Sequence, residues 1–121
     1  MAGAVMTLTE ITYGTVKKIK AEWTSDSVTG AVSATTVNEY DGRILGVCTV
    51  PSATAPTADY DIALNDNDGV DIALGALADR HTSNIEYVAE AAMAGVAHSP
   101  LTIAVTAAGA SKLGTVYIYI R

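Results

Sequence analysis

Two histidines and their acidic neighbours are the side chains of this 121-residue chain that suggest catalysis. Asp79, Arg80 and His81 are consecutive, and a histidine oriented by an acid can serve as the base for a nucleophile. Adjacent loop positions do not build a triad, however, and no G-x-S-x-G turn accompanies them. His98 falls in a second predicted loop, and Arg80 is better explained as pinning its own loop. The sequence therefore predicts no catalytic residue and no enzyme.

A run of oxygen-bearing residues, NDNDGVD at 65–71, suggests calcium, because hard cations favour clustered oxygens. The register of a calcium-binding EF-hand loop fails here. With Gly69 at the invariant glycine, the first ligand position falls on Leu64 and the last on Gly75. We interpret the run as an ordered surface turn. Metal spacings of Cys and His, phosphate loops and dinucleotide fingerprints are also missing, so we expect no metal and no cofactor.

Net charge and apolar run length exclude two classes of partner. The chain carries a net charge of −6, whereas a nucleic-acid binder needs a basic footprint. Its basic cluster, Lys17, Lys18 and Lys20, is typical of a solvated edge strand. No apolar run approaches the roughly 20 residues of a membrane helix, and the first residues lack the basic region of a signal peptide. We expect a soluble protein made in a cytoplasm, with no nucleic-acid or membrane partner.

Cys48 and Trp23 are interpreted as structural. A single cysteine rules out an internal disulfide, and Cys48, in the middle of a predicted strand, is interpreted as a small buried hydrophobe. Trp23 is the largest side chain of the chain and is interpreted as a core anchor. A ligand-stacking surface tryptophan is the alternative.

The stretch 50–74 organises the elements that would position these residues. Tyr60, Ile62 and Leu64 alternate with polar residues, which is typical of a strand with one packed face. Asp68-Gly69 then predicts a hairpin that returns through residues 70–72.

Other segments repeat this alternation. Strands are predicted over 4–13, 15–25, 28–39, 43–50, 85–90, 101–107 and 115–121, with a second hairpin turn at Asp41-Gly42; residues 91–100 show no period. Residues 43–50, apolar on both faces, indicate a strand covered on both sides. About eight strands joined by Gly, Asp and Pro turns predict an all-β fold. We expect one domain over 1–121, an antiparallel two-sheet sandwich of jelly-roll or immunoglobulin-like type.

Positive indications of function concern surfaces. Tyr117 and Tyr119 form a stripe opposite the Val/Ile face of the last strand, and tyrosines are favoured at interfaces. The alternative is that loops of the same chain cover them. The first segment is apolar on both faces, with Met6 and Leu8 on one and Val5 on the other. The predicted partner-contact residues are Val5, Met6, Leu8, Tyr117 and Tyr119.

From about Thr15 to Arg121, the chain resembles small structural proteins encoded among the virion genes of tailed bacteriophages. The resemblance runs through TVKKIKAEWTSD, GRILGVCTVPSATAPTADYDIALNDNDGVDI, ALADRHTSN and LTIAVTAAGASKLGTVYIYIR. Its more specific pieces are ATAPTADYDIALNDNDGVDI and GTVYIYIR. By analogy with small β-sandwich auxiliary proteins, the resemblance implies a capsid cement or decoration protein on the virion surface.

Such a protein would bind the major capsid protein and would act as a homo-oligomer, a dimer or trimer. Two alternatives remain open. One is a virion protein of the tail, neck or fibre, and the other is a carbohydrate-binding sandwich that stacks sugars on Trp23 and the tyrosines.

Overall fold

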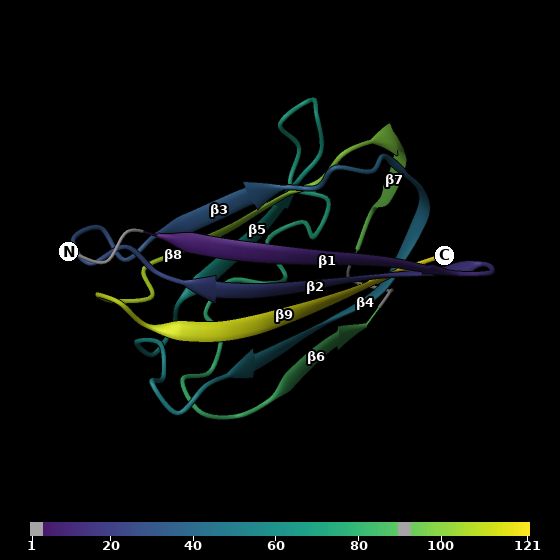
Figure 1. The fold of residues 1–121 in the computed structure, drawn as a ribbon. Coiled ribbons are helices and arrows are strands. Elements are labelled where there is room, and N and C mark those ends of the chain that lie inside the picture. Colours follow the sequence, from purple (N-terminus) through teal and green to yellow (C-terminus); the bar gives the residue numbers. More distant parts are fainter. Residues whose placement is uncertain (1–3, 90–92) are drawn as a thin grey trace.

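The chain folds as two antiparallel β-sheets, in a computed structural model that describes residues 4–89 and 93–121 (Figure 1). Within those residues, the six-stranded sheet has the order β1-β2-β9-β4-β6, with β7 paired to β4, and the three-stranded sheet has the order β3-β8-β5. The strands are β1 Val5–Tyr13, β2 Val16–Thr24, β3 Val32–Thr35, β4 Tyr40–Pro51, β5 Asp61–Asn65, β6 Glu86–Ala89, β7 Gly95–Ser99, β8 Thr102–Thr106 and β9 Leu113–Ile120. This confirms the predicted all-β, two-sheet sandwich.

Alternation along the strands builds the core between the sheets. In β9, Val116, Ile118 and Ile120 are buried, and in β8 Ile103 and Val105 are fully buried opposite them in the other sheet. Inward residues of each antiparallel sheet meet those of its neighbour, and short β-branched side chains fill the thin space between them. The predicted inward faces of both strands are confirmed.

Trp23 is a core residue, as predicted. It is 2% exposed, and its ring lies 5.7 Å from that of buried Tyr60, which joins the two sheets. Gly114 lies opposite Trp23 on β9, and a Cβ there would be 2.6 Å from the indole Cζ2. The indole therefore packs closely against the β9 backbone at Gly114. A stacking role for Trp23 at the surface is excluded.

The predicted hairpin at 59–72 is right for its first strand and its turn, and wrong for its second strand. Tyr60, Ile62 and Leu64 are buried, and the Gly69 N–H donates to the Asp66 carbonyl at 3.1 Å. Beyond the turn a single bridge joins Asn65 to Asp71, and the strand partner of β5 is β8. A strand from a distant part of the sequence has replaced the local one.

Asp41-Gly42 makes no hairpin, because β4 begins at Tyr40 and continues through both residues. Gly42 has a φ of 122°, which side chains rarely adopt, and a Cβ there would overlap the Arg121 carbonyl. The pairing register with β7 shifts at this point. The glycine therefore marks a bulge in a long strand, a structure that shares its sequence signature with a turn.

Two further expectations about strands need correction. Strand β2 lies between β1 and β9, so Lys18 and Lys20 belong to an interior strand and do not guard an edge. The strand predicted over 28–39 is reduced to the four residues of β3. In the region 91–100, which has no period, residues 91 and 92 lie outside the described residues, and β7 forms from Gly95.

Candidate interaction surface

The histidine and acid constellation does not come together as a catalytic site. The His81 Nδ1 accepts backbone N–H groups of Ser83 and Asn84 at 3.0 and 2.9 Å, which closes a local turn. Arg80 donates to the Ala78 carbonyl and lies 3.6 Å from Glu86. These are structural tasks, and Arg80 pins its loop as expected.

His98 is placed far from His81. It lies 3.5 Å from Glu39 on the surface, and its backbone N–H donates to Asp41 near the start of β4. The His81 N–H donates to Glu86, which pairs with Thr49 near the other end of β4. Thr49 lies eight residue steps along β4 from Asp41, roughly 26 Å at the usual rise. The two histidines therefore share no site.

The acidic run at 65–71 uses its carboxylates to hold backbone. Asp66 Oδ1 accepts the N–H groups of Asp68 and Val70, both at 3.0 Å. Asp71 accepts three, from Leu64, Ala73 and Gly75, at 3.0 to 3.1 Å. Among the described residues, no three acidic, His or Cys side chains gather as metal ligands. The geometry agrees with an ordered surface turn.

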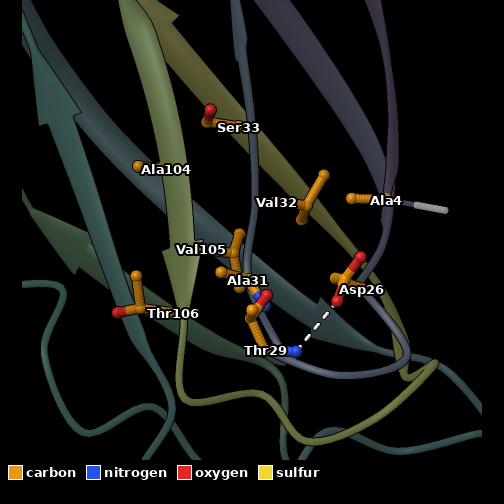
Figure 2. A pocket seen from close by; sticks show the side chains of 9 residues that line it. All are labelled: Ala4, Asp26, Thr29, Ala31, Val32, Ser33, Ala104, Val105 and Thr106. Carbon is orange, nitrogen blue, oxygen red and sulfur yellow. Dashed lines mark hydrogen bonds between the residues drawn. The ribbon is translucent and has the colours of Figure 1, made fainter.

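A pocket of about 460 Å³ opens beside the start of β1, next to β3 and β8 (Figure 2). Ala4 and Val32 supply apolar wall, and Asp26 is the charged group on its rim. Hydrogen bonds from the Thr29 and Val28 backbone N–H groups, each 2.8 Å, hold the Asp26 carboxylate and lower its pKa. The acid is thus part of the β2–β3 turn, and the pocket shows no arrangement for chemistry.

The outer face of the larger sheet carries the predicted tyrosine stripe and extends it. Register places Tyr119 opposite Lys18, and Tyr117 between Lys20 and Cys48. Cys48 in turn lies opposite Tyr87 of β6. We call these six residues the outer tyrosine face: Lys18, Lys20, Cys48, Tyr87, Tyr117 and Tyr119. They come from the strands β2, β9, β4 and β6, which are neighbours in the larger sheet (Figure 1). They alternate with buried residues such as Ile19, Val47 and Ile118, so they face away from the core.

Lys18 lies over two of these rings. Its Nζ is 5.0 Å from the centre of the Tyr117 ring and 5.9 Å from that of Tyr119. Attraction between an ammonium and an aromatic face is worth about 0.5–1 kcal/mol at an exposed site. Lys18 therefore holds its ring neighbours in place, although both tyrosines remain half-exposed.

Tyr87 completes the face and could not be anticipated there. It is 58% exposed, and a Cβ on Gly46 would overlap its hydroxyl end, so the ring lies across the bare backbone of β4. The sequence places Tyr87 on a strand but gives no sign that this strand pairs with β4. An aromatic residue in one strand and a glycine in another form a recognisable pair only once the pairing is known.

Cys48 is mid-strand, as expected, but it is not a buried hydrophobe. It is half-buried and faces outward between two tyrosines, and burial raises the pKa of its thiol. The outer side of β4 is therefore less covered than its inner side. This corrects the expectation that residues 43–50 form a strand covered on both sides. Ile44 and Val47 are fully buried, whereas Leu45 and Val50 are half-buried.

Charge on and beside the outer tyrosine face differs from that of the whole chain. Lys18 and Lys20 lie on it, and Glu22, 3.7 Å from Lys20, is the neighbouring acid. The patch is thus locally positive on a protein of net charge −6. Exposed aromatic area is typical of a surface that binds another macromolecule.

The predicted contact residues of the first segment separate onto two faces. Val5 is 57% exposed on the outer side, while Met6 and Leu8 point inward and pack against the core. The candidate contact residues on the outer side are therefore Val5, Tyr117 and Tyr119.

Compared with known proteins, the chain matches no family model, no curated protein and no solved structure. The part of the chain that the structure describes holds no helix of the length and apolarity needed to cross a membrane. The resemblance to phage virion proteins thus remains a prediction.

Proposed function

We propose that this protein is a capsid cement, or decoration, protein of a tailed bacteriophage. It is made in the host cytoplasm, binds the lattice of the major capsid protein at the virion surface and stabilises that lattice without catalysing a reaction. The observation that carries the proposal is the outer tyrosine face, an exposed aromatic surface on a continuous sheet.

The physics of adhesion suits this face. Tyrosine buries a large area with few rotatable bonds and keeps a polar hydroxyl for the rim of a contact. The ammonium groups of Lys18 and Lys20 would favour an acidic patch on the partner. A lattice presents the same patch many times, so modest contacts add through effective concentration, above all for an oligomer.

The experiment is the addition of purified protein to expanded capsids of the encoding phage from which this protein is missing. We expect binding in a fixed ratio to the major capsid protein, and capsids that withstand higher temperature. Tyr117→Ala with Tyr119→Ala should reduce binding at least tenfold, because two aromatic contacts are lost. Thr35→Ala with Thr102→Ala, on the smaller sheet, is the matched control and should bind normally. Failure of the native protein to bind at any salt concentration would refute the proposal.

Carbohydrate binding is the second candidate, favoured by three tyrosines on one exposed face. Flat aromatic platforms stack on sugar rings, but Lys18 occupies the space above Tyr117 that a sugar would need. Binding to a glycan array that is lost in Tyr119→Ala would support this candidate over cement. A location in the tail, neck or fibre is distinguished by copy number, since a head cement follows the major capsid protein in stoichiometry.

A further inference from the structure

Strand β1 is a long edge strand with one unpaired side. It has nine residues and pairs with β2 along its whole length. In the described part of the chain, no strand pairs with its other side. An unpaired edge presents a row of N–H and C=O groups that can template another strand.

The other edges are short or covered. Strands β3 and β6 have four residues each, and β7, which pairs with β4, has five. Along β5, the segment 72–80 bonds to the free side: Ile72 and Arg80 donate to the carbonyls of Leu64 and Tyr60 at 2.8 and 2.7 Å, and Ile62 donates to Leu77 at 3.0 Å. In the described residues, the other edges are therefore short or covered, and the edge of β1 is long and unpaired.

The sequence of β1 also lacks the usual guards. Residues 5–12 contain no Lys, Arg, Pro or Gly. Their charged residue, Glu10, points inward, where it accepts N–H groups of Val37 and Asn38 at 3.0 and 3.1 Å and the Tyr40 hydroxyl at 2.7 Å. Strand β3, which belongs to the smaller sheet, lies beside β1 but pairs with β8 (Figure 1). Among the described residues of β1, no outward-pointing charge thus blocks the approach of a strand.

We propose that β1 pairs antiparallel with β1 of a second copy of this chain, around a two-fold axis near Thr9. The two larger sheets then form one continuous sheet across the dimer. This inference does not rest on the capsid proposal, although a dimer doubles the number of outer tyrosine faces.

A second copy is the occupant that the strand itself specifies. Around Thr9, the register places Thr7 opposite Ile11 and Thr9 opposite Thr9 on the outer side, pairs that favour antiparallel sheets. Glu10 lies opposite Leu8, so no like charges meet. Val5, which is 57% exposed, and the partly exposed Met6 and Leu8 gain cover. A two-fold contact of this kind uses the long edges of both copies, so assembly stops at the dimer.

The test is the solution mass of the native protein and of variants that place a charge at the two-fold axis. Light scattering measures this mass over a range of micromolar concentrations. The native chain should have twice its 12.4 kDa monomer mass. Thr9→Glu sets two carboxylates opposite each other and should dissociate the dimer at least tenfold more readily. Within the monomer it lies beside Lys20, so its fold is supported. Thr115→Lys, opposite Glu22 on interior strand β9, is the control and should remain dimeric.

Mixing Thr9→Glu with Thr9→Lys should restore a dimer, which a merely misfolded variant would not do. In a Cys48→Ser background, Thr9→Cys should oxidise to a covalent dimer, whereas Thr115→Cys should not, because only strands directly opposed bring two β-carbons within disulfide range. A native protein that stays monomeric at high concentration, or a dimer that survives Thr9→Glu without crosslinking through Thr9→Cys, would overturn the proposal.

Discussion

Glu10 illustrates how one carboxylate fixes a crossing between the sheets. Burial alone would raise its pKa, but hydrogen bonds from Val37, Tyr40 and Asn38 outweigh burial, and the net pKa lies below the ordinary 4.5. The pKa of the Tyr40 hydroxyl is raised, mainly by burial and next by its contact with Glu10. The side chain thus ties β1 to the segment that leads into β4.

The Glu10 contact predicts a pH-dependent stability. A depressed pKa stabilises the folded state above pH 4.5 and loses that effect as pH falls through the folded value. Glu10→Gln should therefore lower stability at pH 7 by about 1 kcal/mol, since partial solvent access weakens the lost bonds. Urea denaturation at pH 7 and pH 3 measures the difference, which should shrink at pH 3. Glu22→Gln, an exposed control, should show no such trend; an equal loss for Glu10→Gln at both pH values would contradict the assignment.

Two glycines of the larger sheet predict losses of stability of different size when a methyl group is added. In Gly114→Ala the methyl meets the buried indole of Trp23, which cannot move aside, and overpacking of this kind costs about 1–3 kcal/mol. In Gly46→Ala the methyl meets the exposed end of the Tyr87 ring, which can swing away, at a cost below about 1 kcal/mol.

Denaturation midpoints and tryptophan fluorescence compare these two variants. A shifted emission maximum is expected for Gly114→Ala alone, because only there does the indole move. Equal destabilisation by both methyl groups would show that Tyr87 is as firmly held as Trp23.

At the scale of elements, the segment after β5 does not form the predicted strand. The Asp71 side chain holds this segment in position. Because its carboxylate accepts three backbone N–H groups, Asp71→Ala should destabilise the protein by about 2–3 kcal/mol. Asp71→Asn keeps one carbonyl oxygen and should cost about half as much. Thermal unfolding measures both, with Asp68→Ala, exposed in the same turn, as the control. A cost for Asp71→Ala no greater than that of the control would show that the loop needs no such anchor.

Strands whose apolar residues alternate strictly could be predicted from the sequence, and strand partners could not. Ile103 and Val105 in β8, and Ile118 in β9, carry a pattern that burial alone explains. Asp41-Gly42 and Asp68-Gly69 look alike, yet one is a bulge against the last residue of the chain and the other is a turn. What separates them is a neighbour about 80 residues away.

The candidate surface follows the same division. The pair Tyr117 and Tyr119 shows in the alternation of one strand, whereas Tyr87 joins them through the β4–β6 pairing, and Lys18 through β2–β9. Lysines at 18 and 20 were expected on an edge because local sequence does not reveal which strands lie outermost. Sequence periodicity gives the face of a residue, and only non-local pairing gives its neighbours.

At the scale of the molecule, charge distribution predicts how the outer tyrosine face meets a partner. Since the patch is positive on an acidic protein, Lys18→Glu should weaken binding to capsids at least tenfold, more than the neutral Lys18→Ala does. Added salt should reduce the difference in capsid affinity between the two variants, because it screens charge. Equal binding by both would locate the capsid contact elsewhere on the protein. Lys112→Glu, in the loop before β9, is the control for the change in net charge.

The single thiol of the chain provides a natural labelling site on the outer tyrosine face. Cys48 is the chain's single cysteine, and it faces outward between Tyr117 and Tyr87. Partial burial and its raised pKa make alkylation slow at neutral pH, so the rate of maleimide attachment is easy to follow. Any partner seated over those rings will slow it further. Labelling kinetics in the native chain can therefore footprint docking, with no engineered probe.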